Sequence, residues 1–182
     1  MKIRDDICFW CQGRAWIGRA VLLCIFVGLG ICYLFDPTFW SVISPVNLMI
    51  HESGHFIFGF AGVTLAILGG TLMQLLIPLV FGGYFLFQPD YFAACFCSVW
   101  FSMNLYESAT YIADARAQAL PLLGGDGSTH DWHFLLSQMF LLPYDTAIAN
   151  GIRVVAFIIF WSSLAFGAWM VWEMAWSQGK KK

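Results

Sequence analysis

Most of this chain consists of successive apolar runs, each long enough to cross a bilayer as a helix. A transmembrane helix needs about 20 consecutive, mostly apolar residues, because the hydrocarbon layer is about 30 Å thick and each helical residue rises about 1.5 Å. We expect helices of this kind at residues 15–35, 40–61, 63–87, 91–113 and 152–176.

The composition indicates one helical bundle in the membrane and no separate soluble domain. Of the 182 residues, 60% are hydrophobic and only 11% are charged, whereas about a quarter of the residues of a typical globular domain are charged. The net charge of −2 and the scattered lysines and arginines leave no basic face for nucleic acid. We predict an all-α polytopic membrane protein, a single domain over residues 1–182 with five or six transmembrane or re-entrant helices.

An HExxH motif lies in the middle of the second apolar run, within the segment NLMIHESGHFIFG. On a helix, His51 and His55 are one turn apart on the same face, so their imidazoles can bind one metal ion. Glu52 lies beside them and is free to act as a base. Zinc peptidases hold Zn²⁺ and activate a water molecule in this way. Ionisable groups at bilayer depth each cost about 2.5–3.5 kcal/mol, so their presence there indicates function.

The two apolar runs after the motif carry features that favour a site inside the bundle. The run 63–87 is interrupted by several glycines and by Pro78. This pattern fits either an irregular backbone that brings Gln74 to the metal site or close helix packing at small residues. The run 91–113 ends in a polar stripe at helical spacing, formed by Asn104, Glu107, Ser108, Tyr111 and Asp114. Such a stripe must face the interior, where the two motif histidines are its natural partners.

These features together resemble the site-2 protease class of intramembrane zinc metalloproteases. The shared pattern is an HExxH motif on one membrane helix, a Gly-rich apolar segment next, and an Asn followed about ten residues later by an Asp on another helix. The resemblance covers residues 47–116. It implies a bound Zn²⁺ ion, a catalytic base at Glu52, and three metal ligands, namely His51, His55 and Asp114.

The resemblance also assigns Asn104 and Gln74 to orienting the substrate. The third ligand has alternatives, because the family usually has Gly after the Asp and prolines between the Asn and the Asp, and this chain has neither. Glu107 lies one or two turns away on the same helix face as Asp114. His130 belongs to the polar segment GGDGSTHDWH and would complete the zinc site if its loop folds back.

Residues 114–150 form a long connection between the last two predicted spans. Such connections in small bundles are usually functional or disordered, and the glycines at 124–127 supply turn chemistry. A solvated polar loop with ordinary surface histidines remains an open interpretation. The apolar piece 132–142 is too short to span, so we expect it in the membrane interface or as a re-entrant segment.

The charge distribution predicts the orientation of the first span. Lys2, Arg4 and Arg14 precede it, which favours a cytoplasmic N-terminus. We expect an integral protein of a bacterial inner (plasma) membrane. Five spans would then place the lysines at 180–182 outside, so three alternatives stay open: the segment 62–87 is re-entrant, the segment 132–149 inserts, or the lysine tail is translocated.

Cys8 and Cys11 form one CxxC motif before the first apolar run. A closed zinc site needs four ligands, and no second cysteine pair is near. We expect these to be interfacial thiols kept reduced in the cytoplasm, with a redox or metal role as the alternative. The other four of the six cysteines lie in or beside apolar runs and are expected to be small core residues.

The sequence thus predicts a zinc metalloendopeptidase that hydrolyses peptide bonds of membrane proteins or transmembrane peptides, in or next to the membrane. One alternative is a metal-ion transporter in which Glu52 is a ligand, and another is a catalytically silent scaffold of the same fold. A haem protein is disfavoured, because histidines at i and i+4 cannot ligate opposite faces of a haem.

Overall fold

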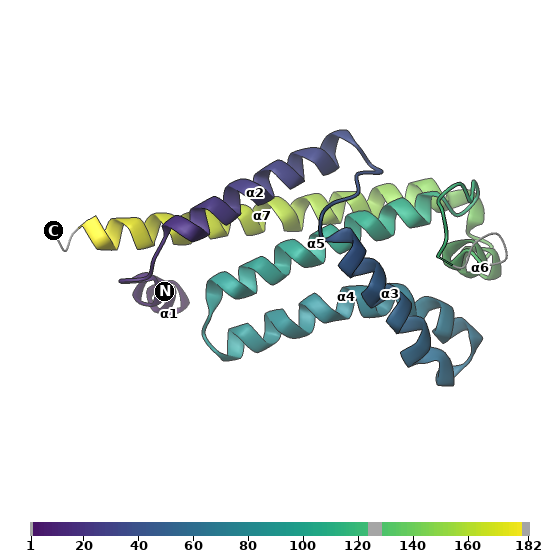
Figure 1. Ribbon diagram of the computed structural model, residues 1–182, viewed down its shortest axis with the longest axis horizontal. Coiled ribbons are helices and arrows are strands. Elements are labelled where there is room, and N and C mark those ends of the chain that lie inside the picture. The colour runs from purple at the N-terminus through teal and green to yellow at the C-terminus, as the bar shows by residue number, and fades with distance from the viewer. Residues whose placement is uncertain (1, 124–128, 180–182) are drawn as a thin grey trace.

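The computed structural model describes residues 2–123 and 129–179, and over these ranges the chain forms helices and no strand (Figure 1). The turn predicted at 124–127 and the lysine tail at 180–182 lie outside the described residues. The α-helices are α1 (Lys2–Cys11), α2 (Ile17–Phe35), α3 (Ser44–Phe58), α4 (Val63–Phe87), α5 (Tyr91–Ala113), α6 (Asp131–Gln138) and α7 (Asp145–Gly179), with single 3₁₀ turns at Gly59–Ala61 and Leu142–Tyr144.

Helix α5 is the centre of the bundle, because it packs against α7 on one side and α4 on the other. Figure 1 shows α2 alongside α7, both chain ends at one end of the bundle, and α6 at the opposite end. Helix α3 crosses the first half of α4 and extends with it from the side of the bundle. This arrangement brings α3, α4, α5 and α6 together at one place.

The central apolar core lies between α2, α5 and α7. It is built around Phe160, with Phe26, Val99 and Met103 buried against it. Gly30 makes this approach possible, since a Cβ atom there would lie 2.4 Å from Cε1 of Phe160. Between helices in a membrane, such contacts stabilise the bundle through van der Waals packing at small residues. The core therefore fixes α5, which carries the polar stripe.

Three helical segments of the described chain are long and apolar enough to cross a membrane: α2, α4 and Leu142–Gly179. The all-α prediction is confirmed for the described residues, and the three segments are compatible with a membrane protein. A bundle of five or six spans is not confirmed. Helix α3 has 15 residues and is about 22 Å long, which is shorter than a hydrocarbon layer of about 30 Å.

The connection from 114 to 150 contains the short helix α6, which packs against α4 and α5 at the end of the bundle. Helix α7 begins at Asp145, before the start expected at 152. Asp145 is fully buried and its Oδ1 lies 2.7 Å from Nη2 of Arg116, which follows α5. This ion pair joins the end of α5 to the start of α7, so the residues before 152 extend the last helix.

The CxxC motif lies in α1, which packs against α7. Cys11 is fully buried and Cys8 is partly exposed, and all six cysteines are free. Burial raises the pKa of the Cys11 thiol to about 11. Because the thiolate is the form that attacks disulfides and binds metals, a protonated Cys11 favours a packing role.

Candidate metal centre

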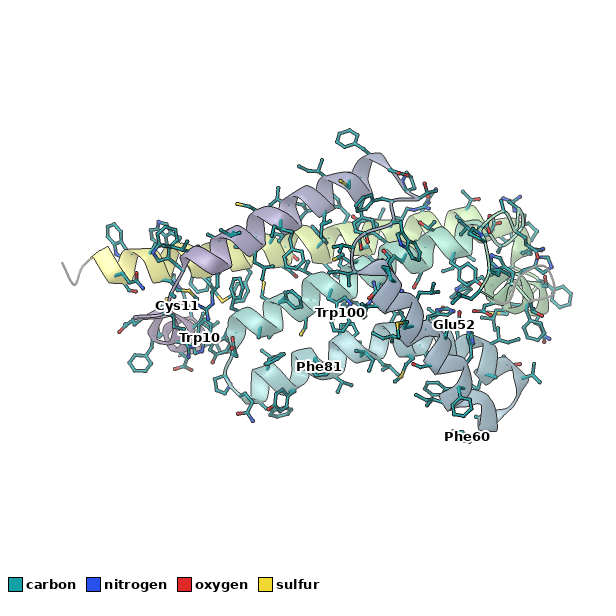
Figure 2. All side chains as sticks on the ribbon, viewed as in Figure 1. Trp10, Cys11, Glu52, Phe60, Phe81 and Trp100 are labelled. Atoms are coloured by element: carbon teal, nitrogen blue, oxygen red, sulfur yellow. The ribbon has the colours of Figure 1, made fainter. Side chains whose placement is uncertain are left out.

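The HExxH motif lies on α3, where Figure 2 labels Glu52, and its two histidines face Gly70 of α4 and Asp131 of α6. Pro45 is in the first turn of this helix, where its fixed φ suits helix initiation. One helical turn separates His51 from His55, and their ring centroids are 4.8 Å apart. His51, Glu52 and His55 each offer a ligand atom, and these atoms lie within 4.8 Å of one another. The geometry thus provides a group that can hold a metal ion.

Helices α3 and α4 cross closely at Gly54, Gly69 and Gly70, and this crossing determines where the imidazoles lie. Gly62, with φ of +100°, turns the chain from one helix into the other, a conformation that favours glycine. A Cβ atom on Gly54 would lie 2.2 Å from the carbonyl oxygen of Gly69. A Cβ atom on Gly70 would lie 2.5 Å from Nε2 of His51 and 2.7 Å from Cε1 of His55. The small residues therefore allow close packing and admit both rings. The segment 63–87 is a continuous helix rather than an irregular backbone, and it brings Gln74 to His51 all the same.

Replacing Gly70 with Ala is expected to destabilise the chain by about 1–3 kcal/mol, because the new methyl group must displace the His51 ring in a packed site. Gly83→Ala in the same helix is the matched control, since a Cβ atom there meets nothing within 4 Å. That substitution is expected to stabilise the helix by roughly 0.5–1 kcal/mol. Thermal unfolding of the two purified variants in detergent checks this, and shifts of the same sign and size would contradict it.

The Nδ1 atom of each imidazole is held by a hydrogen-bond acceptor. The Nδ1 of His55 lies 2.8 Å from the carbonyl oxygen of Ala66, which can only accept, so Nδ1–H donates. The Nδ1 of His51 lies 3.1 Å from Oε1 of Gln74. Metal-binding histidines usually donate their second ring N–H in this way, which fixes the tautomer and the ring orientation. The Nε2 atoms are therefore the ring atoms that remain to bind a cation.

Asp131, the first residue of α6, supplies the carboxylate at this site. Its Oδ2 lies 3.0 Å from Nε2 of His51 and 3.2 Å from Nε2 of His55. Burial raises the pKa of the Asp131 carboxyl, but hydrogen bonds from the two imidazoles outweigh burial and leave that pKa below its usual range. Asp131 is therefore a carboxylate that faces both motif histidines.

Three contacts hold Asp131 in this position. The Nε1–H of Trp132 donates to Oγ1 of Thr71 in α4 at 3.2 Å. The backbone N–H of Asp131 donates to the hydroxyl of Tyr111 in α5 at 3.2 Å. The Nδ1 of His130 accepts from the backbone N–H of His133 and caps α6. Helix α6 is thus attached to two helices on either side of the site.

The distances from the Asp131 carboxylate to the two Nε2 atoms suit a bound metal ion. Two ligand atoms about 2.0–2.1 Å from one ion at a tetrahedral angle lie roughly 3.3–3.4 Å apart, close to the observed 3.0 and 3.2 Å. With each Nδ1–H donating elsewhere, neutral imidazoles present two lone pairs to an anionic oxygen. A positive charge is required between them, either as protons on the imidazoles or as a bound cation.

Asp114 and His130, which the sequence suggested as third ligands, face each other instead. Nε2 of His130 lies 3.3 Å from Oδ2 of Asp114. The Asp114 carboxylate also accepts from the backbone N–H groups of Ala119 and Leu120, each at 3.0 Å. His130 is buried, which lowers its pKa, and its ring lies 4.3 Å from that of Tyr111. These contacts link the end of α5 to residues 119–120 and to the start of α6.

Glu107, Gln74 and Asn104 form a layer behind His51. Nε2 of Gln74 donates to Oε2 of Glu107 at 3.0 Å and to Oδ1 of Asn104 at 3.1 Å. Asn104 is fully buried, so it faces Gln74 within the bundle rather than an open surface. The third-ligand alternative Glu107 reaches His51 only through Gln74.

No protein-family model, curated protein or solved structure matches this chain.

The sequence did not single out Asp131 as a candidate ligand. It lies directly after His130 and just before the apolar segment 132–142. Asp at the start of a short helix is common, because carboxylates favour helix N-termini. One signal in the sequence could have indicated it. An HExxH motif supplies only two protein ligands, and a catalytic zinc site needs a third. The polar residues of 129–133 could provide that ligand.

Proposed function

We propose that this chain is a zinc metallopeptidase that acts on peptide segments within or next to a membrane. The observation that carries the proposal is the convergence of His51 Nε2, His55 Nε2 and Asp131 Oδ2 while both Nδ1 atoms are held by acceptors. Two imidazoles and one carboxylate with an open fourth position are a donor set of catalytic zinc sites.

Glu52 is the base in this proposal. A zinc ion bound by the three ligands would lower the pKa of a water molecule towards ~7 and polarise the scissile carbonyl. Glu52 is exposed and lies next to His51, so its carboxylate can accept the proton of the attacking water. It can then pass that proton to the leaving amine, which completes hydrolysis.

The position of the site supports a substrate at the membrane. Gly70, which faces both imidazoles, lies about 10 Å along α4 from Val63, at about 1.5 Å per residue. Because α4 is one of the apolar helices long enough to span, this places the site within its apolar length. The His55 side chain is 27% exposed, so the site is accessible from one side. A helical substrate must unwind there, since its carbonyls are otherwise hydrogen-bonded.

The test is detection of new peptide termini. Wild type and Glu52→Gln, each purified in detergent, are incubated with detergent-solubilised membrane proteins, and newly formed termini are identified by mass spectrometry. The proposal expects termini that appear with wild type alone, disappear with a chelator and return with zinc. Identical termini with both proteins would contradict it.

One observation favours transport as a second candidate. A carboxylate oxygen of Glu52 also lies within 4.8 Å of the ligand atoms of His51 and His55. As a fourth protein ligand, Glu52 would close the site and leave no position for a substrate. In that case Glu52→Gln lowers zinc affinity, and the wild type carries zinc across proteoliposome membranes. The peptidase proposal expects neither result.

A further inference from the structure

A chain of hydrogen bonds with a fixed direction leads from Trp100 towards the site. The indole Nε1–H of Trp100 can only donate, and it donates to Oδ1 of Asn47 at 2.8 Å. The amide of Asn47 is thereby oriented, and its Nδ2 donates to Oε2 of Glu107 at 2.8 Å. Asn47 is fully buried, so it has no water to exchange with. This series of hydrogen bonds thus leads to the carboxylate of Glu107, which accepts from Asn47 on one side and from Gln74 on the other.

Glu107 orients the second amide in the same way. Its Oε2 also accepts from Nε2 of Gln74 at 3.0 Å, and Gln74 is buried. With that NH₂ group committed to Glu107 and to Oδ1 of Asn104, the Oε1 of Gln74 is the atom that faces Nδ1 of His51. The Nδ1–H of His51 therefore donates to Gln74, and Nε2 is the ring atom that faces Asp131.

We propose that Glu107 is a positioning residue for the metal centre, and that it acts through Gln74 to select the metal-binding tautomer and orientation of His51. This inference rests on the proposed function, because it concerns the same zinc site. Glu107 touches none of the three ligands, and His55 is oriented independently by the carbonyl of Ala66.

The other oxygen of Glu107 has a different role. Its Oε1 accepts from Oγ of Ser44 at 2.6 Å and from the hydroxyl of Tyr33 at 3.3 Å. Hydroxyl groups rotate and can also accept. A glutamine at position 107 can therefore turn its NH₂ group to these hydroxyls and keep an oxygen for Asn47 and Gln74. A leucine offers no acceptor at all.

The experiment measures the zinc dissociation constant by competition with a chelator, on the full chain in detergent. Gln74→Met and Glu107→Leu are each expected to raise it about 10–100-fold, the usual effect of losing an outer partner of a metal-bound histidine. Glu107→Gln is expected to stay within about twofold of wild type. Tyr33→Phe, which loses only the Oε1 contact, is the control and is also expected to stay within about twofold.

A double-mutant cycle separates positioning from a general structural role. If Glu107 acts through Gln74, then adding Glu107→Leu to Gln74→Met raises the dissociation constant by less than about threefold further. The inference would be overturned if the increase in the double variant equalled the product of the two single increases. It would also be overturned if Gln74→Met and Glu107→Leu both bound zinc as tightly as wild type. A wild-type chain that binds no zinc would overturn the proposed function itself, so the two failures are distinguishable.

Discussion

Glu52→Gln is expected to reduce peptide cleavage by at least about 10²–10⁴-fold, the usual contribution of a general base, and to leave the zinc content unchanged. The amide keeps the size of the side chain but cannot accept a proton from water. Because Glu52 is exposed, the substitution removes no buried contact. Cleavage is measured as the rate of formation of the new termini, and zinc by elemental analysis of the same samples.

Thermal unfolding of Glu52→Gln is the control, and it is expected to match wild type. Full cleavage by this variant would contradict the assignment of the base. Loss of zinc together with cleavage would instead indicate that Glu52 is a ligand, as transport requires.

Asp131→Asn is expected to weaken zinc binding by more than the roughly 10–100-fold that follows loss of an outer partner. The substitution keeps the shape of the side chain but removes the charge that faces both Nε2 atoms at 3.0 and 3.2 Å. Asp114→Asn is the matched variant. Its carboxylate contacts His130 and two backbone N–H groups, so zinc affinity is expected to stay within about tenfold of wild type.

The zinc dissociation constants of both variants are compared alongside their thermal unfolding, since Asp114 also holds residues 119 and 120. The opposite order of effects, with Asp114→Asn losing zinc and Asp131→Asn retaining it, would contradict the geometry and favour the ligand set implied by the site-2 protease resemblance.

The helical character of the chain was predictable because apolar length and helical spacing are local properties. Helices α4 and α5 have the bounds expected for the runs 63–87 and 91–113. The shortness of α3 was not predictable, because Pro45 lies in its first turn and the chain continues after Phe58 as a 3₁₀ turn, so the helix covers only part of one apolar run. The early start of α7 depends on the pairing of Asp145 with Arg116, a contact between distant segments.

The motif on α3 identified two imidazoles and a glutamate from their spacing alone, since i and i+4 share a helix face. The carboxylate facing them could not be identified that way. Asp114 and Asp131 are both polar residues near apolar segments, and only the attachment of α6 through Trp132 and Tyr111 selects between them. Gln74 was recognised as close to the site, but its link to Glu107 depends on how α4 packs against α5.

Anomalous scattering from crystals of the purified chain, recorded across the zinc absorption edge, tests the metal centre most directly. The account predicts one peak about 2.0–2.2 Å from His51 Nε2, His55 Nε2 and an Asp131 carboxylate oxygen. No peak at these residues in crystals grown with zinc, or a peak bound by Asp114 with Asp131 turned away, would contradict it.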